Sequence, residues 1–168
     1  MRALIVSDSH GSTKELQQLK ETYAGNVDVM IHCGDSELKP EHPSLQEFEV
    51  VKGNCDFYNG FEDEIITDVN ELRFLLTHGH RYNIKMTLQT LLYRAKEAKA
   101  NIVCFGHSHI LGAEIIDDIL FINPGSVLLP RSRNEKTFAL LEVNAKEIEI
   151  RFETLEGKVV AQKTFQRG

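Results

Sequence analysis

Seven side chains that could bind metal ions lie in five short segments, and each segment directly follows an apolar stretch. The set combines carboxylates, one amide and imidazoles: Asp8, His10, Asp35, Asn54, His78, His107 and His109. Hard oxygen donors mixed with imidazole nitrogens suit a pair of first-row divalent ions. Two such ions held a few ångströms apart can bind a phosphate, lower the pKa of a bridging water and direct that water at phosphorus.

The apolar stretches before these residues are predicted to be buried strands. The first two, residues 2–6 and 27–32, flank an amphipathic stretch at 12–23. The chain therefore opens as β-α-β, which predicts a parallel strand pair with a right-handed crossover. In open α/β sheets, ligands bind beyond the carboxyl ends of the strands. If these strand ends gather at one edge, all seven side chains can converge there.

Two amphipathic helices are predicted to cover the sheet. The first, at 12–23, begins with a capping-box pattern of Ser12 or Thr13 with Glu15. One face of this helix is apolar at helical spacing: Leu16, Leu19 and Tyr23. The second helix has a similar face: Ile84, Leu88, Leu91, Leu92 and Ala95. Both helices can therefore bury one side against strands.

The remaining segments predict strand pairs. We expect a hairpin over 64–78, two short strands in 113–123, and a meander over 137–165. Residues 55–63 have the character of an active-site loop. The chain contains no linker, repeat or low-complexity stretch, so residues 1–168 are expected to form a single α/β domain with mixed strand directions.

Taken one at a time, most of the motifs have a common structural explanation. Asp8 at a strand end is more often a turn or N-cap residue, and Gly-Asp at 34–35 and Gly-Asn at 53–54 are common turns. The His-Gly-His at 78–80 and the Gly-His-x-His at 106–109 are more specific. A histidine before glycine at a strand end is not typical of core packing.

The other histidines are expected to do different things. His32 lies within a strand and is predicted to be a hydrogen-bonded core or edge residue, while His42, near prolines, is expected to be exposed. His80 is open to two interpretations: it contacts a substrate phosphate, or it orients His78 from behind. Cys33 and Cys104 lie in apolar runs and are expected to be ordinary buried thiols, because no CxxC spacing is present.

Composition narrows the classes of function. The chain has 168 residues, 42% of them hydrophobic and 26% charged, as in a globular protein with a sizeable core. No apolar run approaches the roughly 20 residues that a membrane span needs, and the N-terminus does not resemble an export signal, so a cytoplasmic location is expected. The net charge of −6 disfavours long nucleic acids. A small phosphate ester can still be attracted by bound cations.

The order of the five motifs carries more information than any one of them. Asp-x-His, Gly-Asp, Gly-Asn, His-Gly-His and Gly-His-x-His follow one another between residue 4 and about residue 126, where Asn123-Pro124-Gly125-Ser126 ends the match. This order resembles the calcineurin-like metallophosphoesterase family, in particular its minimal prokaryotic phosphodiesterases. The resemblance implies a four-layer α/β/β/α sandwich and a phosphodiesterase acting on small phosphodiesters.

The resemblance also implies a role for each metal ligand. Asp8, His10 and His109 would hold the first ion, and Asn54, His78 and His107 the second, with Asp35 bridging the two. A hydroxide between the ions would attack phosphorus, and Asn54 would help to stabilise the developing charge. Manganese is the metal implied for small members. The donor types alone also admit nickel, zinc, iron and magnesium.

One position departs from the family pattern. Where a histidine usually follows Gly-Asn and precedes an acid, this chain has Cys55 and then Asp56. The family histidine is thought to donate a proton to the leaving group, and we hypothesise that the Cys55 thiol does so less well, which favours esters with good leaving groups. The alternative is that Cys55 only fills space. The catalytic residues predicted beside the ligands are Asn54, Cys55, Asp56 and His80.

Two other classes of function remain as alternatives. The same family includes a retromer subunit that is a binding platform with an impaired metal site, so a non-catalytic scaffold is one rival. A nuclease is the other, although the acidic balance disfavours it. Arg131, Arg133 and Lys136 could meet a substrate phosphate or form a solvated loop. Exposed sheet edges leave a homo-oligomer open.

Overall fold

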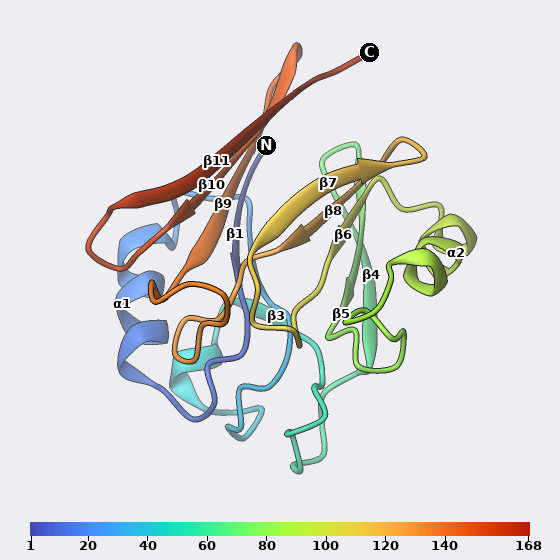
Figure 1. The fold of residues 1–168 in the computed structure, drawn as a ribbon. Coiled ribbons are helices and arrows are strands. Elements are labelled where there is room, and N and C mark those ends of the chain that lie inside the picture. The colour runs from blue at the N-terminus through green and yellow to red at the C-terminus, as the bar shows by residue number, and fades with distance from the viewer.

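Two β-sheets pack face to face, and one helix covers the outer side of each (Figure 1). The structure is a computed structural model that describes residues 1–168. The four layers are therefore helix, sheet, sheet and helix, which confirms the fold expected from the motif order. Neither of the two α-helices is long and apolar enough to cross a membrane.

The first sheet has six strands in the order β11-β10-β9-β1-β2-β3. Its bounds are β1 (Arg2–Val6), β2 (Val29–His32), β3 (Phe48–Val50), β9 (Phe138–Val143), β10 (Glu147–Glu153) and β11 (Val159–Gln166). The strands β1, β2 and β3 are parallel, and β9, β10 and β11 form the expected antiparallel meander. The three parallel strands thus end on the same side.

The second sheet has five strands in the order β4-β5-β6-β8-β7. Its bounds are β4 (Glu64–Val69), β5 (Leu72–Thr77), β6 (Ile102–Cys104), β7 (Gly112–Ile116) and β8 (Ile119–Asn123). The strands β5, β6 and β8 are parallel, and the predicted pairs β4–β5 and β7–β8 are antiparallel. The loops after β5, β6 and β8 therefore leave this sheet at one edge.

Alternating side chains build the layers. In β1, Ala3 and Ile5 belong to the core between the sheets, whereas Leu4 and Val6 pack toward helix α1 (Lys14–Tyr23). The same alternation in β6 directs Val103 toward helix α2 (Gln89–Ala98). This period of two is what a strand buried on both faces requires. The predicted apolar face of α1 is confirmed by Leu16 and Leu19, which are buried.

The predicted start of each α-helix needs correction. The capping box does not form: Thr13 has helical rather than extended backbone angles and makes no capping bond, and the Ser12 hydroxyl donates to the Glu15 carboxylate. The second helix starts only at Gln89. Before it, Asn83 has a left-handed φ of 53° and accepts turn hydrogen bonds, which interrupts the helix.

Ile84 and Leu88 therefore precede α2, although both still pack in its cluster.

His42 is not exposed as predicted. It is half-buried, and its ring accepts a hydrogen bond from the Ser44 amide at 3.1 Å, which caps a short 3-10 helix at Pro43–Leu45. A residue directly before the first proline of a helix is in the N-cap position, and this role of His42 was not predicted from the sequence.

Candidate metal centre

The predicted ligands follow the carboxyl ends of parallel strands in both sheets. Asp8 follows β1 and Asp35 follows β2, whereas His78 follows β5 and His107 follows β6. A hydrogen bond joins the two edges directly, because the His107 amide donates to Asp8 Oδ2 at 3.0 Å. The site thus lies between the sheets, at the edge where their parallel strands end.

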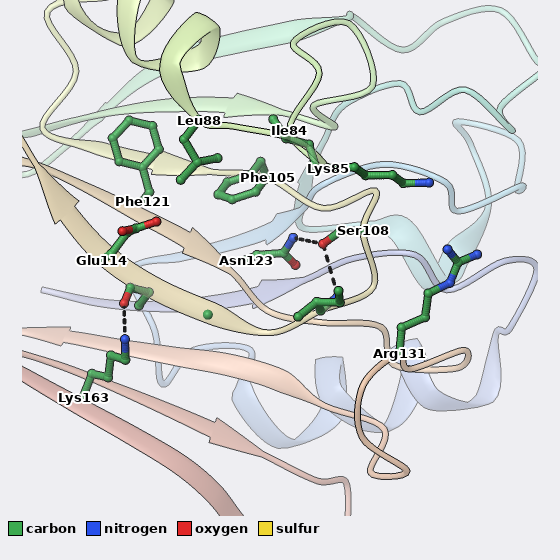
Figure 2. A pocket seen from close by; sticks show the side chains of 13 residues that line it. Ile84, Lys85, Leu88, Phe105, Ser108, Glu114, Phe121, Asn123, Arg131 and Lys163 are labelled. Atoms are coloured by element: carbon green, nitrogen blue, oxygen red, sulfur yellow. Dashed lines mark hydrogen bonds between the residues drawn. The ribbon is translucent and has the colours of Figure 1, made fainter.

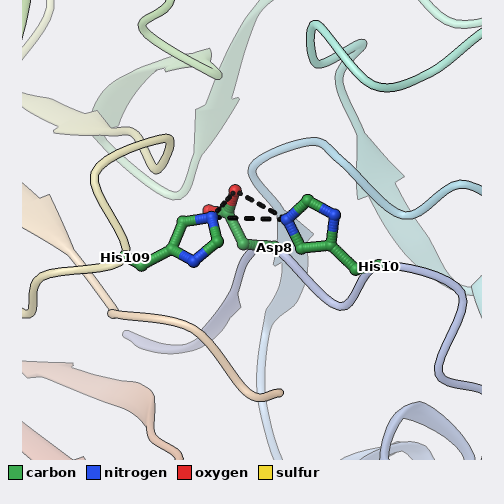
Figure 3. A group of neighbouring side chains, drawn as sticks. All are labelled: Asp8, His10 and His109. Carbon is green, nitrogen blue, oxygen red and sulfur yellow. Dashed lines mark hydrogen bonds and ion pairs between the residues drawn. The ribbon is translucent and has the colours of Figure 1, made fainter. Parts of the chain in front are cut away.

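The first group of ligands is Asp8, His10 and His109 (Figure 3). His109 Nε2 is 3.1 Å from Asp8 Oδ1, and His10 Nε2 is 3.7 Å from the same oxygen. The two imidazole nitrogens are 3.3 Å apart. Three donor atoms therefore point at one small volume, and they are the atoms predicted for the first ion.

A second group joins Asp8, Asp35 and His78. His78 Nε2 is 3.1 Å from Asp35 Oδ2 and 3.8 Å from Asp8 Oδ1. His10 Nε2 is also 3.8 Å from Asp35 Oδ2, so the groups are contiguous. Asp8 is shared by both groups, which places it as centrally as Asp35, the residue predicted to bridge.

The imidazoles are oriented through their other ring nitrogen. His78 Nδ1 donates to the Cys33 carbonyl at 2.7 Å, and His109 Nδ1 donates to the Leu129 carbonyl at 2.6 Å. His10 Nδ1 lies 3.0 Å from a carboxylate oxygen of Glu37. Bonds of this kind fix the tautomer and leave the Nε2 lone pair free for a metal.

Two buried atoms at the centre, Asp8 Oδ1 and His78 Nε2, have no hydrogen bond, although each lies 3.1 Å from an oppositely polar atom, His109 Nε2 and Asp35 Oδ2. An unsatisfied buried polar atom costs about 1–3 kcal/mol, so such atoms are rare without a reason. A divalent cation between them would satisfy both. The residues present therefore fit the metal ions that the sequence implies.

The charges at the centre also suit cations. Burial alone would raise the pKa of Asp8, but the neighbouring His10, His109 and His78 hold it well below its ordinary value. His10 has its pKa raised to about 9, mainly by Asp8, so without a metal its imidazole is protonated at pH 7 and a cation that binds Nε2 would displace that proton. Burial lowers the pKa of His107 to about 4, so this imidazole is neutral at pH 7. Ionised carboxylates and a neutral imidazole are the forms that bind metal.

The backbone at the ligands is strained. Five of the seven have a left-handed φ: Asp8 (54°), His10 (42°), Asp35 (58°), His107 (71°) and His109 (61°). This conformation costs a non-glycine residue about 1–2 kcal/mol. It persists only where the surroundings fix it, as they do at functional sites. The pattern of residue types gave no signal for this feature.

Asn54, Cys55 and His107 belong to neither of these two groups. The Asn54 side chain is exposed, and its amide nitrogen is 3.7 Å from Cys55 Sγ. His107 is half-buried, with its ring 5.1 Å from that of His78. Cys55 Sγ lies near ligand atoms of His10 and Asp35, within 4.8 Å of them. Burial and Asp35 raise the pKa of this thiol to about 11.

Asp56 is buried, and its carboxylate is bound by backbone N–H groups. Its two oxygens accept the backbone N–H groups of Asp35 and Gly53, at 2.8 and 2.7 Å, and of Glu37, at 2.8 Å. The carboxylate therefore holds the Gly-Asp and Gly-Asn turns together. These three hydrogen bonds and its burial give Asp56 a structural role in the two turns, and a catalytic contact of Asp56 stays a prediction.

His80 does not have one of its two predicted roles, that of orienting His78. It cannot orient His78 by a hydrogen bond, because His78 Nδ1 is bonded to the Cys33 carbonyl. Its own Nδ1 is buried without a partner, and its ring lies 5.4 Å from that of His78. His32 is buried and hydrogen-bonded to Ser9 and the Gly34 amide, which confirms a core histidine.

Two residues of the Asn-Pro-Gly-Ser segment support the centre, although no role was predicted for them. The Ser126 hydroxyl donates to the Asp8 carbonyl at 2.7 Å. The Asn123 amide donates to the Gly106 carbonyl at 3.1 Å and to the Ser108 hydroxyl at 3.0 Å, which fixes the loop that carries His107 and His109. The signal was available, because this segment also follows a strand of the parallel set.

This sandwich, with its carboxylates and imidazoles at the strand ends, defines the class of metallophosphoesterases. Residues 1–146 match the family described as the calcineurin-like phosphoesterase superfamily domain. The chain is 48% identical over 152 residues to "Probable metallophosphoesterase YsnB" of Bacillus subtilis, which covers 90% of each chain. The protein therefore belongs to the calcineurin-like phosphoesterase superfamily.

Other relatives and solved structures extend this result. "Phosphodiesterase MJ0936" of Methanocaldococcus jannaschii is 28% identical over 148 residues, or 74% of this chain and 83% of that one. A predicted phosphoesterase from Streptococcus pneumoniae superposes with a TM-score of 0.95 at 36% identity, covering 99% and 97%. Vacuolar Protein Sorting 29 from Cryptosporidium parvum shares the fold, with a TM-score of 0.81 at 18% identity, covering 99% and 98%.

Proposed function

We propose that this protein is a two-metal phosphodiesterase that hydrolyses small phosphodiesters. The observation that carries the proposal is the pair of contiguous ligand groups that share Asp8, with Asp8 Oδ1 and His78 Nε2 buried in them without a hydrogen bond. In this proposal His10 and His109 complete the first site. Asn54 and His107 complete the second site beside His78, and Asp35 spans the two.

When bound, the two ions would acidify and orient the attacking water and neutralise charge on the phosphate. The protein's own groups fix the rest of the geometry. Asp35 is held by the Cys55 amide, which donates to its Oδ1 at 2.8 Å. The exposed Asn54 amide is proposed to donate to a phosphate oxygen. Asp56 acts as a positioning residue for these turns, and His80 is proposed to contact the substrate.

The proton donor to the leaving group is proposed to be Cys55, as the sequence predicted. A thiol is a weak donor that is protonated at neutral pH. Replacing it by histidine should raise kcat by about tenfold or more for esters with poor leaving groups, and little for p-nitrophenyl esters. A series of aryl diesters of rising phenol pKa would measure this effect. Equal changes on all members of the series would show that Cys55 only fills space.

Small diesters and manganese are proposed on chemical grounds. The mixture of carboxylate, amide and imidazole donors suits Mn²⁺, and Ni²⁺, Zn²⁺, Fe²⁺ and Mg²⁺ remain chemically possible. Relatives named phosphodiesterases support diesters as the substrate class. The net charge of −6 disfavours long polyanions and hence a nuclease. A cytoplasmic location, a single domain and a possible homo-oligomer remain predictions.

The test is hydrolysis of bis-p-nitrophenyl phosphate beside p-nitrophenyl phosphate. Metal-stripped protein should be inactive, and added Mn²⁺ should restore cleavage of the diester in preference to the monoester. Asp35→Asn and His78→Ala should abolish it while the protein stays folded. Cleavage of the monoester alone would make the protein a phosphomonoesterase instead.

A non-catalytic scaffold is the alternative, because Vacuolar Protein Sorting 29 shares the fold. That likeness, at 18% identity, concerns the fold alone. The seven donor positions of this chain are all occupied by residues able to bind metal, which supports an enzyme. Folded protein that is inert with every divalent metal tested would favour the scaffold.

A further inference from the structure

A pocket of about 580 Å³ lies beside the metal centre, between the segment before α2 and the strands β7 and β8 (Figure 2). Its volume is in the range of roughly 300–1,000 Å³ that small-molecule sites occupy. Part of the wall is apolar and aromatic: Ile84, Leu88, Phe105 and Phe121. None of the functions assigned above uses it.

The pocket and the metal centre share their loops. Ser108, which lines the pocket, stands between the ligands His107 and His109. Arg131, at the same end, donates its backbone N–H to the His109 carbonyl at 3.0 Å. On the other side, a side chain at Gly79, next to His78, would touch Ile84 and Phe105 of the wall. The loops that carry the metal ligands therefore also line this pocket, so a molecule bound at the metal centre lies next to it.

The charged side chains of the pocket lie at its two opposite ends. Figure 2 shows Lys85 and Arg131 at the end where Ser108 lies, and Glu114 and Lys163 at the opposite end. Lys85 and Arg131 are exposed and take part in none of the ion pairs of the structure. Two uncompensated cations thus stand beside the centre of an acidic protein.

The far end offers a different kind of contact. Glu114 is exposed and unpaired, so its carboxylate can accept hydrogen bonds. Lys163 donates to the Ala113 carbonyl at 2.7 Å, which fixes its ammonium group at the pocket wall. From the metal-facing end outward, the pocket therefore presents cations, an apolar and aromatic wall, and a hydrogen-bonding end.

We propose that this pocket binds the non-leaving ester group of the substrate, and that this group is a nucleoside or a similar planar ring that carries hydrogen-bond donors. Lys85 and Arg131 bind the anionic phosphate as it reaches the metal centre, the apolar wall holds the sugar and ring, and Glu114 accepts from the ring edge. This proposal rests on the proposed phosphodiesterase function and names its substrate class.

Gly112 allows the pocket to be filled without disturbing the fold. It lines the pocket, its φ is not left-handed, and a Cβ built on it meets no atom within 4 Å. Gly112→Trp would therefore place an indole in the pocket. Lys85→Ala and Arg131→Ala remove the two cations, and Lys14→Ala, an exposed residue at the start of α1, is the matched control for loss of one charge.

The experiment compares two diesters with the same leaving group, the p-nitrophenyl ester of thymidine 5′-phosphate and p-nitrophenyl methyl phosphate. We expect the manganese-loaded protein to have the lower KM for the thymidine ester. Gly112→Trp should raise that KM about tenfold more than it raises the KM for the methyl ester. Lys85→Ala and Arg131→Ala should each raise the KM for the thymidine ester severalfold, and Lys14→Ala should change neither substrate.

Binding of thymidine 5′-monophosphate, measured by calorimetry beside inorganic phosphate, separates this proposal from the proposed function. Nucleotide binding that is weakened by Gly112→Trp in a protein that cleaves neither ester would support the pocket and contradict the phosphodiesterase. Cleavage of both esters with equal KM, and equal effects of Gly112→Trp on the two, would overturn the pocket alone. A Gly112→Leu variant gives the same test if the tryptophan variant does not fold.

Discussion

The two sheets contribute different chemistry to one site. The loops of the six-stranded sheet supply both carboxylates, the amide and one imidazole, whereas those of the five-stranded sheet supply imidazoles only. The carboxylates are held by donors, as when the Cys55 amide bonds to Asp35. The imidazoles of the second sheet are held by carbonyl acceptors, as when His78 bonds to the Cys33 carbonyl.

The difference shows that neither sheet can build the centre alone. The first sheet carries negative charge that needs a counter-charge, and the second carries neutral lone pairs that need an acceptor ion. The two halves are kept in register by the apolar core between the sheets, a cluster of 17 buried residues. The spacing of the metal ligands is therefore a consequence of how two sheets pack.

The largest effect should come from removing a carboxylate ligand, which should cost more activity than removing an imidazole ligand. Asp8→Asn removes a charge that both ligand groups share, so kcat for bis-p-nitrophenyl phosphate should fall by at least about a thousandfold. His109→Ala removes one neutral donor from one group and should cost less, about a hundredfold. Steady-state kinetics with saturating Mn²⁺ would measure both. Equal losses would remove the distinction between the two sheets.

Two glycines press against the carboxylates, one from each sheet. A methyl group at Gly53 would overlap Asp35, and one at Gly106 would overlap Ser7 and Asp8. Gly53→Ala and Gly106→Ala should each weaken metal binding by about ten- to a hundredfold, because displaced ligands bind poorly. Calorimetric titration with Mn²⁺ would show this. Unchanged affinity in both variants would mean that the loops adapt and that the ligand positions are not fixed by packing.

The core between the sheets should matter to the metal more than an equally buried core elsewhere. Ile5→Ala opens a cavity between the sheets and Leu91→Ala opens one under α2, and both residues are fully buried. Each should lower the free energy of unfolding by about 2–5 kcal/mol. Only Ile5→Ala should also weaken metal binding, by about tenfold. Denaturant unfolding of the metal-free variants, beside metal titration, would separate the two effects.

The smallest effect at neutral pH concerns a histidine that binds no metal. Burial lowers the pKa of His32 to about 4, below its ordinary 6.5. Below pH 6.5 the unfolded chain therefore binds a proton at His32 that the folded protein does not bind. The contribution of His32 to the free energy of unfolding should be complete above pH 6.5. It should decrease by about 3 kcal/mol as the pH drops toward 4.

The measurement is chemical denaturation of the metal-free protein between pH 7 and pH 4, with His32→Gln as the comparison. The variant should show a shallower slope than the unchanged protein, because glutamine does not titrate, whereas His107, whose pKa is also lowered to about 4, still does. The stabilisation that comes from Asp8 and Asp35 has the same sign but a lower window, since both pKa values are lowered and their ordinary value is 3.8. An equal slope in the two proteins would contradict the assignment.

The sequence was sufficient for the strands and the family because the signals were local. An apolar run ending in a polar turn identifies a strand, and the order of five such ends identified the family. The role of Asp56 was not accessible in this way, because two of its backbone partners lie about twenty residues away at Asp35 and Glu37. The start of α2 depended on the left-handed backbone at Asn83, which the apolar spacing of Ile84 and Leu88 concealed.

The pocket was the least visible from the sequence. Arg131 and Lys85 lie 46 positions apart in the chain and belong to different loops, so their common location depends on the tertiary fold. From the sequence, Arg131 belonged to a short basic run that could meet a substrate phosphate or form a solvated loop. Residue types can predict what a strand end offers, whereas the space between loops requires the packed structure.

The most direct test of the central claim is a titration of metal-free protein with Mn²⁺ during hydrolysis of bis-p-nitrophenyl phosphate. If the two sheets together build a two-metal centre, activity should rise until two equivalents are bound and then stay constant. Maximal activity at one equivalent, or two bound equivalents without diester cleavage, would contradict the account.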